Sequence, residues 1–253
     1  MIALRSVSLR SRATGAPVLD QITLELAAGE VAVVTGPSGS GKTALTRLVY
    51  AAARPDSGQV LVFDRDLARL RASSLSLLRR RVAVVPQEMA LLERESAVAN
   101  AAAPLAVAAV PRREAHARAA VALARFGLAE LGALPVSRLS SGQRRRVCLA
   151  RAAVAEPSLL VADDPTAHLD ADGRLAFVDL ATEISGRGGA ALVASSDPAL
   201  VAAAIRLNWR VVDLSAPRTA PGAAGEPPEA GEEIPNVVPF PLGARAGAHG
   251  GRP

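Results

Sequence analysis

The sequence predicts an α/β protein with a doubly wound core, and three features lead to this prediction. Continuous apolar runs of four or five residues recur along the chain, as in strands that are buried on both faces of a parallel sheet. Helix-like segments alternate with these runs. A glycine-rich turn joins the first run, residues 31–35, to the helix that follows it. With 253 residues, the chain can bury a substantial core and is expected to form one domain or a domain with a subdomain.

The expected elements begin with two strands of antiparallel type. Residues 2–9 and 18–26 alternate apolar and polar side chains with a period of two residues. Because a sheet with one solvated face produces this alternation, we expect an antiparallel subdomain beside the parallel strands. The later elements are expected to be a helix after the glycine-rich turn, a strand over 60–63, a basic helix over 67–81, a strand over 82–85, an α-helical subdomain within about 90–155, a strand over 159–162, a helix over about 172–186, a strand over 190–194, a short helix from Pro198 and a strand over 209–214.

The glycine-rich turn matches a phosphate-binding loop at all four of its fixed positions. Glycines let the backbone curl so that successive N–H groups face one anion. The lysine supplies a compact positive charge between phosphate oxygens, and the threonine supplies a hydroxyl for Mg²⁺. This lysine is the only one in a chain whose other basic residues are arginine. The turn consists of Gly36, Pro37, Ser38, Gly39, Ser40, Gly41, Lys42 and Thr43.

The composition argues against several classes of function. Aromatic residues make up only 2% of the chain, so the net charge of +5 does not indicate a nucleic-acid partner, for which stacking side chains would be expected. The single cysteine, Cys148, excludes an intramolecular disulfide and fits a reducing cytoplasm. We expect no signal peptide, and no apolar stretch reaches about 20 residues, so work at a membrane would require another chain that crosses it.

The composition changes after Ser215. From there the sequence is rich in Pro, Ala, Gly and Glu and poor in aliphatic residues, so it cannot bury enough apolar surface to order itself. We therefore expect a nucleotide-binding domain over residues 1–215. Residues 216–253 are expected to be a disordered tail that acts as a flexible linker.

Four further motifs follow the phosphate-binding loop in a fixed order. They are Gln87 after the run 82–85, the stretch 139–143, the acidic end of the run 159–164, and the stretch 167–170. Over residues 2–214 this set resembles the ATP-binding subunits of ABC transporters, with the stretch 139–143 as the signature motif. The resemblance implies a P-loop fold with a mixed sheet core, an antiparallel β subdomain and an α-helical subdomain. Within the family, the chain is most similar to the FtsE-type cell-division subunits and their LolD-like and macrolide-exporter relatives.

The resemblance implies that the chain binds ATP with Mg²⁺. Thr43, Gln87 and Asp163 are the implied Mg²⁺ ligands, with Asp163 acting through water. The implied catalytic residues are Gln87, Asp164, which positions the attacking water, and Ser196, which stands at the switch-histidine position. Phosphoryl transfer from ATP to water requires such charge neutralisation and an aligned water.

The resemblance also implies partners. The signature residues Ser140, Ser141, Gly142 and Gln143 are implied to contact the γ-phosphate of ATP held by a second subunit, so that ATP joins a homodimer or heterodimer. Hydrolysis then releases the dimer, which is a ligand-driven shift of population. An integral-membrane, permease-like partner (FtsX-like) would hold the subunit on the cytoplasmic, inner face of the plasma membrane.

Several residues depart from the family pattern. Asp164 replaces a glutamate and is one methylene shorter, and a displacement of about 1 Å can cost on the order of 100-fold in rate. Ser196 replaces a histidine with a hydroxyl that cannot carry positive charge. Arg12 lies near the position of an aromatic residue that stacks on adenine, so base binding is weakened by about 1–3 kcal/mol unless the Arg12 guanidinium stacks instead. Ser141 replaces the first signature glycine. We therefore expect slow ATP hydrolysis.

Two alternatives stay open beside slow hydrolysis. In the first, the chain is a non-catalytic scaffold gated by nucleotide. In the second, it is the degenerate half of a heterodimer with a consensus ATPase. A DNA-handling ATPase of related architecture is disfavoured, since no long coiled-coil insertion separates the motifs.

Two surface features are also expected. Arg144, Arg145 and Arg146 read as a solvated helix face, and residues 89–92 as a partly buried segment with an exposed apolar edge.

Overall fold

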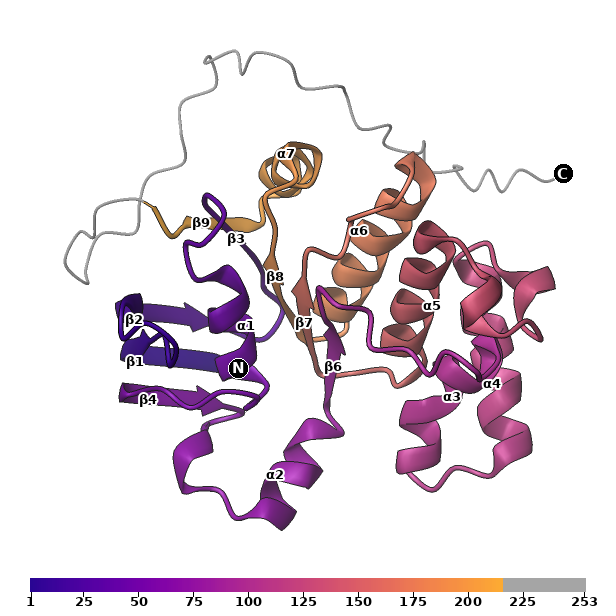
Figure 1. Ribbon diagram of the computed structural model, residues 1–253, viewed down its shortest axis with the longest axis horizontal. Helices are drawn as coiled ribbons and strands as arrows, with labels where there is room; N and C mark the ends of the chain where they lie inside the picture. The colour runs from indigo at the N-terminus through magenta and orange to yellow at the C-terminus, as the bar shows by residue number, and fades with distance from the viewer. Residues whose placement is uncertain (216–253) are drawn as a thin grey trace, which may run out of the picture.

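The computed structural model describes residues 1–215, which form two sheets and seven α-helices (Figure 1). The expected tail over 216–253 lies outside the described residues. The antiparallel sheet has the order β2-β1-β4-β5 and consists of β1 (Ile2–Arg10), β2 (Pro17–Leu26), β4 (Ser57–Val62) and β5 (Arg65–Asp66). The parallel sheet has the order β6-β7-β8-β3-β9 and consists of β3 (Val31–Thr35), β6 (Val82–Val85), β7 (Leu159–Asp163), β8 (Ala190–Ala194) and β9 (Arg210–Asp213). The helices are α1 (Lys42–Val49), α2 (Ala72–Arg79), α3 (Ala97–Val107), α4 (Arg112–Arg125), α5 (Ser141–Val154), α6 (Ala171–Gly186) and α7 (Pro198–Arg206), with short 3-10 turns η1 (Leu67–Arg69), η2 (Ala129–Leu131) and η3 (Val136–Arg138).

The central parallel strands β3, β7 and β8 are almost entirely apolar because both faces of the sheet are covered there. In β3, Val31 and Val33 belong to one hydrophobic cluster, whereas Ala32 and Val34 belong to the other. The side chains of β7 and β8 divide between the same two clusters in the same alternating way. The period of two residues is thus present in a strand that shows no polar alternation. The expected α/β fold class is confirmed.

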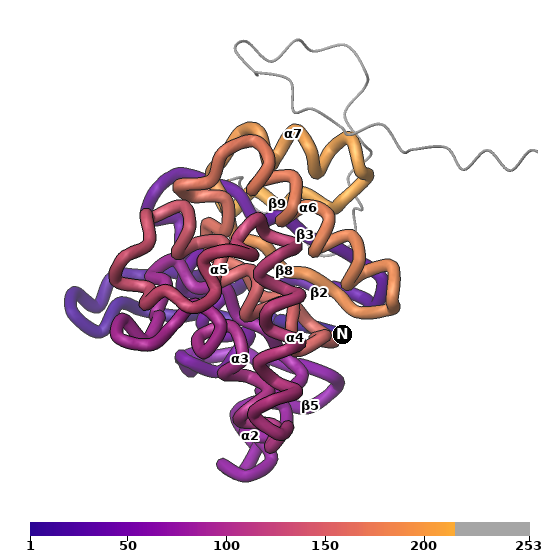
Figure 2. Tube along the Cα trace, turned by 90° about the vertical axis from the view of Figure 1, so that its right-hand side faces the viewer, coloured from indigo at the N-terminus to yellow at the C-terminus, as the bar shows by residue number. Residues whose placement is uncertain are grey.

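The layers follow from this division. Helix α1 packs between the two sheets and touches β2, β4, β7 and β8, while α6 covers the other face of the parallel sheet. Helices α3, α4 and α5 pack on one another as a separate group. Figure 1 shows this group on the side of the parallel sheet away from β1 and β2, and Figure 2 shows α4 facing the viewer with α2 below and α7 above. No helix within residues 1–215 combines the length and the apolarity needed to cross a bilayer.

The expected basic helix over 67–81 is broken in the structure. The Asp66 side chain accepts a hydrogen bond from the Ala68 N–H at 3.0 Å and caps the short turn η1. Leu70 and Arg71 are then extended, so α2 starts only at Ala72. An aspartate that can bond the backbone two residues on favours a local turn over a continuous helix, which explains the difference.

Candidate functional site

The phosphate-binding loop connects the carboxyl end of β3 to α1, and its curl depends on glycine. Gly36, Gly39 and Gly41 have φ angles of 141°, 84° and 94°, in the region that residues with a side chain avoid. A Cβ at Gly36 would lie 2.8 Å from Ser40 Oγ, and a Cβ at Gly41 would lie 2.6 Å from Leu19 Cδ2. The loop therefore needs glycine to bring its backbone N–H groups around one point.

Lys42 holds a positive charge inside the loop. Its side chain is buried, and Nζ donates hydrogen bonds to the carbonyl oxygens of Gly36 at 2.7 Å and Pro37 at 2.9 Å. Ser40 Oγ is buried and has no hydrogen-bond partner among the residues described. Because an unpaired buried hydroxyl is costly, the loop is suited to a ligand whose oxygens accept from Ser40 and face the ammonium of Lys42. A phosphate group has these properties.

Three oxygen-bearing side chains from different elements meet beside the loop. Thr43 Oγ1 lies 3.5 Å from Oε1 of Gln87, which follows β6, and Thr43 also hydrogen-bonds Asp163 at the end of β7. Burial raises the pKa of the Asp163 carboxyl, against the effect of the hydrogen bond from Thr43. A hydroxyl, an amide oxygen and a carboxylate whose ionised form is poorly solvated together fit a hard divalent cation such as Mg²⁺.

Asp164 and Ser196 lie at the edge of the same site. The backbone of Asp164 is left-handed, with φ 44°, and its N–H donates to the carbonyl oxygen of Ala194 at 2.8 Å. Asp164 Oδ1 accepts a hydrogen bond of 3.4 Å from the Ser196 N–H, and Ser196 Oγ donates to the Gly36 carbonyl oxygen at 3.1 Å. The hydroxyl of Ser196 is thus bonded to the phosphate loop itself.

Most of these groups line one cavity of about 580 Å³, a size suited to a nucleotide, whereas Ser40 and Asp163 are not in its wall. Lys42, Thr43, Gln87, Asp164 and Ser196 are in its wall. The wall also includes Ser38, Gly39, Gly41, Arg12 and three arginines that the motif comparison does not mark, Arg10, Arg47 and Arg54. Their only signal in the sequence is position: Arg10 lies near Arg12, Arg47 is on the helix after the loop, and Arg54 follows that helix.

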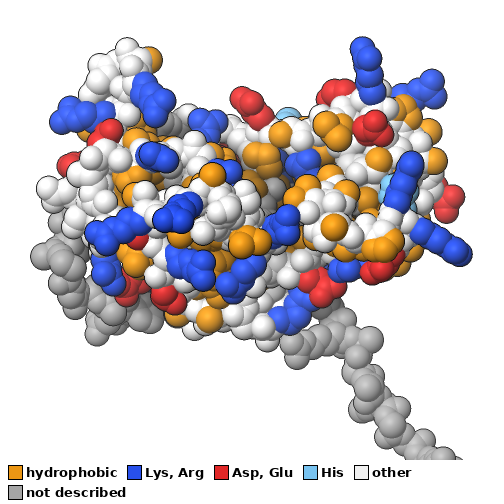
Figure 3. Space-filling model, turned by 90° about the horizontal axis from the view of Figure 1, so that it is seen from below, with side chains coloured by type: hydrophobic (Ala, Val, Ile, Leu, Met, Phe, Trp, Pro, Cys, Tyr) orange, Lys and Arg blue, Asp and Glu red, His pale blue; other side chains and the backbone are white. Residues whose placement is uncertain are grey.

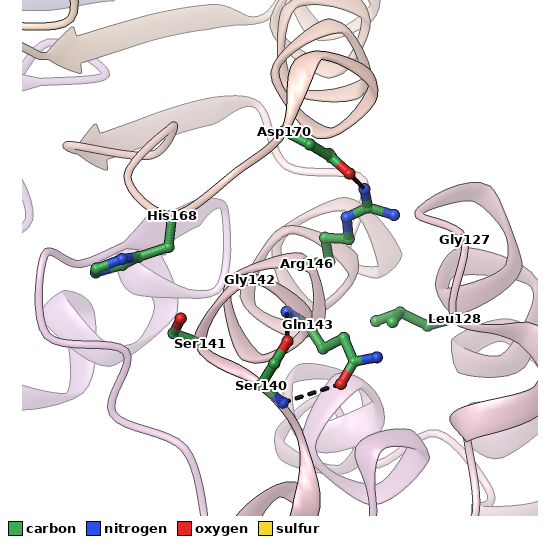
Figure 4. A pocket seen from close by; sticks show the side chains of 9 residues that line it. All are labelled: Gly127, Leu128, Ser140, Ser141, Gly142, Gln143, Arg146, His168 and Asp170. Atoms are coloured by element: carbon green, nitrogen blue, oxygen red, sulfur yellow. Dashed lines mark hydrogen bonds and ion pairs between the residues drawn. The ribbon is translucent and has the colours of Figure 1, made fainter.

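The signature residues form a second cavity of about 480 Å³ (Figure 4). Ser140 caps α5: its Oγ accepts from the Gln143 N–H at 3.2 Å, and Gln143 Oε1 accepts from the Ser140 N–H at 2.9 Å. This reciprocal capping leaves the remaining N–H groups of the first turn facing the cavity. No lining residue is shared between the two cavities, so one chain does not bring Ser141 and Gly142 to the phosphate loop. The cavity is lined by Gly127, Leu128, Ser140, Ser141, Gly142, Gln143, Arg146, His168 and Asp170.

A family model described as ABC transporter matches residues 19–167, which is more than half of the chain and includes both cavities' principal motifs. The chain belongs to the ABC transporter family. The matched part of this ABC protein is an ATP-binding domain, as the resemblance implied. Two dimeric solved structures are similar to it. One, of a bacterial ABC transporter cassette, has a TM-score of 0.74, 27% identity, and covers 78% of this chain and 88% of its own. The other, an ATP-binding cassette in a post-hydrolysis state with ADP and Pi, has a TM-score of 0.73 and 26% identity over the same shares.

Curated relatives differ in how much of their length the ABC protein spans. It is 32% identical to the cell division ATP-binding protein FtsE of Haemophilus influenzae over 79% of its own length and 92% of that protein. It is 37% identical to the lipoprotein-releasing system ATP-binding protein LolD of Chromohalobacter salexigens, over 73% and 79%. It is also 37% identical to the methionine import ATP-binding protein MetN of Mesorhizobium japonicum. That match covers 73% of this chain but only 51%, about half, of the MetN protein.

Arg145 is a site residue that the sequence analysis missed. The expected solvated helix face is wrong for this residue, which is only 1% exposed on α5. Its two terminal nitrogens donate to the carbonyl oxygens of Pro86 at 2.7 Å and Gln87 at 2.8 Å. Burial lowers the pKa of the Arg145 guanidinium, and nearby charges, including that of Asp164, act in the opposite direction. A buried cation therefore holds the backbone of Gln87 from the signature helix.

Two more side chains of α5 hold the segment after Gln87. Cys148 Sγ contacts the carbonyl oxygen of Met89 at 3.3 Å, and Arg151 donates to the carbonyl oxygens of Met89 at 3.1 Å and Ala90 at 2.9 Å. Arg145, Cys148 and Arg151 are spaced three residues apart and so lie along one side of the helix. In the expected apolar segment, Met89 packs against the core, whereas Leu92 is 59% exposed.

The other two arginines of the run are also bonded. Arg146 donates to Asp170 Oδ2 at 2.7 Å and to the Phe126 carbonyl oxygen at 3.3 Å, and Arg144 pairs with Glu93 at 3.3 Å. Asp170 caps α6 by accepting from the Gly173 N–H at 2.9 Å, and this bond together with Arg146 lowers the pKa of Asp170. The run thus connects α5 to three neighbouring segments.

Proposed function

We propose that the chain is the ATP-binding subunit of an ABC-type membrane complex, that MgATP bound in the first cavity draws two subunits into a dimer, and that hydrolysis is slow. The proposal depends on one observation above all: Lys42, Thr43 and Gln87 line one cavity together with Asp164 and Ser196, and the buried carboxyl of Asp163 lies behind Thr43, with which it interacts.

In this proposal, the loop and Lys42 bind the β- and γ-phosphates. Thr43 and Gln87 would hold Mg²⁺ directly and Asp163 through water. The ion, when bound, supplies neutralisation of the negative charge on the phosphate oxygens. Lys42 is already oriented by the carbonyl oxygens of Gly36 and Pro37, so little side-chain freedom is lost when ATP binds.

Slow hydrolysis follows from the two altered positions. Asp164 would orient the attacking water, but its carboxylate is one methylene short of the family glutamate. The Ser196 hydroxyl donates its hydrogen bond to the Gly36 carbonyl oxygen, so it has no second O–H with which to bond the γ-phosphate. Because neither Asp164 nor Ser196 matches the family residue, we expect poor positioning of the attacking water to be the main cause of a low hydrolysis rate.

The experiment compares four variants by calorimetry and by steady-state ATP hydrolysis. Lys42→Ala is expected to lose MgATP binding by at least tenfold, because the charge-assisted contacts to phosphate are lost. Asp164→Glu and Ser196→His are each expected to raise turnover, whereas Asp164→Asn is expected to change it little. Rapid hydrolysis by the parent that disappears in Asp164→Asn would refute the slow-turnover part, and unchanged MgATP affinity in Lys42→Ala would refute the whole proposal.

An FtsE-like role is the specific assignment that we favour for the complex. It is supported by the span of similarity, which covers 92% of the FtsE relative but about half of the MetN relative. The partner would be an integral-membrane, FtsX-like permease, with the subunit at the cytoplasmic face of the membrane. Arginine side chains spread over the face seen in Figure 3 would favour such a position near anionic headgroups.

Leu92 is our candidate contact for the permease. It is an exposed apolar side chain in the segment after Gln87, and α5 holds the start of this segment through the bond from Arg145 to the Gln87 carbonyl oxygen. Leu92→Ser is expected to reduce the amount of membrane partner that co-purifies. Val121→Ser on α4, which removes an apolar side chain that is 73% exposed, is the matched control and is expected to change nothing. Equal recovery of the partner with both variants would exclude Leu92 from the interface.

A second candidate is the degenerate half of a heterodimer, which the substitution at both Asp164 and Ser196 favours. Isolation of the native complex distinguishes the two. A complex with a single kind of ATP-binding subunit supports the homodimer, and a complex with a second, consensus ATPase supports the heterodimer.

A further inference from the structure

We propose that His168 of one subunit donates a hydrogen bond to the γ-phosphate of the ATP bound by the other subunit, and so supplies across the dimer the imidazole that position 196 lacks. The inference rests on the proposed ATP-driven dimer, in which the signature cavity of each chain covers the partner's phosphate loop. It concerns the one imidazole in the lining of that cavity.

The position of His168 is fixed by the signature turn itself. His168 lies between β7 and α6, and its carbonyl group packs against Gly142, where a Cβ would lie 2.8 Å from the carbonyl oxygen. Whatever Ser141 and Gly142 contact in the dimer is therefore within the neighbourhood of His168 as well. In Figure 4 the imidazole projects on the side of the signature turn that faces away from Leu128.

The imidazole is available for a ligand. The His168 side chain is exposed, and within residues 1–215 it makes no hydrogen bond or ion pair. The one arginine in the lining of the cavity, Arg146, is already paired with Asp170. An imidazole N–H is a suitable donor to a phosphate oxygen.

The backbone at His168 is compatible with histidine. It is left-handed, with φ 65°, a conformation in which histidine is enriched among residues other than glycine. The turn therefore presents an imidazole that is exposed beside the signature residues without requiring an unusual residue there.

The need for such a donor comes from the first cavity. Ser196, which stands at the family's histidine position, donates its hydroxyl hydrogen bond to the Gly36 carbonyl oxygen at 3.1 Å. Lys42 is held on the side of Gly36 and Pro37. A donor from the partner subunit would supply the hydrogen bond to the γ-phosphate that Ser196, bonded to the loop, does not.

The test measures dimerisation of the full chain by analytical ultracentrifugation with Mg²⁺ and the non-hydrolysable analogue AMP-PNP. His168→Gly removes the imidazole and keeps the left-handed backbone, and we expect the dimer dissociation constant to rise at least about tenfold, since a contact is lost at both sites. His168→Gln keeps an N–H donor of similar reach and is expected to restore part of the loss. His116→Gln on α4, outside the lining of both cavities, is the control and is expected to match the parent.

A second measurement establishes that the contact crosses the dimer. At protein concentrations where only monomers are present, His168→Gly is expected to bind Mg²⁺-AMP-PNP with the parent's affinity. A loss of monomer affinity would place His168 on its own subunit's nucleotide and overturn the inference, as would parent-like dimerisation of His168→Gly. If the parent itself does not dimerise with the analogue, it is the proposed function that fails.

Discussion

Replacement of Arg145 by methionine is expected to be among the most damaging single changes on α5. The change removes two charge-assisted hydrogen bonds, of 2.7 Å and 2.8 Å, and leaves the carbonyl oxygens of Pro86 and Gln87 without these donors. Each such loss costs about 1.5–3 kcal/mol. Part of this is recovered because a guanidinium no longer has to be buried, which is the same penalty that lowers the pKa of Arg145. We expect a net loss of about 2–4 kcal/mol in the free energy of unfolding.

The assay is urea denaturation of the nucleotide-free protein, followed by calorimetric titration with MgATP. Methionine fills the space of the arginine stem as far as Nε and keeps the site apolar, so the slope of the unfolding free energy with urea is expected to stay constant while the midpoint falls. MgATP affinity is expected to fall as well, since Gln87 loses the group that holds its backbone. Arg113→Met on the exposed side of α4 is the control, with an expected change within about 0.5 kcal/mol. A loss in Arg145→Met no larger than in this control would refute the reasoning.

Three further predictions use the titratable groups. Asp163→Asn is expected to raise the free energy of unfolding of the nucleotide-free protein at neutral pH by on the order of 1 kcal/mol. The raised pKa of Asp163 means that the folded protein loses stability as pH rises through that pKa and the carboxyl ionises, a loss that asparagine avoids. A variant that is destabilised in denaturation would contradict this. Asp170→Ala is expected to cost about 1 kcal/mol. Because the pKa of Asp170 is lowered, this difference should persist above about pH 4 and shrink below it, and a constant difference would count against it. Cys148 is expected to react with an alkylating agent only on unfolding, because burial raises the pKa of its thiol, so rapid modification of the native protein would disprove the prediction.

The sequence predicts the regular part of this fold closely, because in that part the local pattern and the tertiary environment agree. The run over 82–85 is the strand Val82–Val85, and the run over 190–194 is the strand Ala190–Ala194. The motifs at the carboxyl ends of β3 and β7 are brought together, as parallel strands require. The two-residue strand β5 (Arg65–Asp66) was missed, because so short a segment carries no period.

Arg145 could not be predicted, because its burial depends on a long-range pairing. In the sequence it is the middle of three arginines, a pattern that usually faces solvent. Its bonding partners, the carbonyl groups of Pro86 and Gln87, are 59 and 58 residues away and carry no side-chain signal. Helical spacing offered one hint: Arg145 lies three residues before Cys148, and a free cysteine is among the residue types most often buried.

The same helix connects the two cavities, and this bears on how nucleotide in one is sensed at the other. Ser140, at the start of α5, lines the signature cavity, while Arg145 holds the backbone of Gln87, whose side chain lines the nucleotide cavity. The bonds from α5 to this segment go to backbone carbonyl groups, so a shift of Gln87 toward a bound cation would move the segment and α5 together. Since packed elements move between discrete positions rather than bending continuously, binding at one cavity would reorient the other as a unit. Loss of Arg145 should therefore weaken ATP-driven dimerisation by more than its effect on monomer affinity alone would produce.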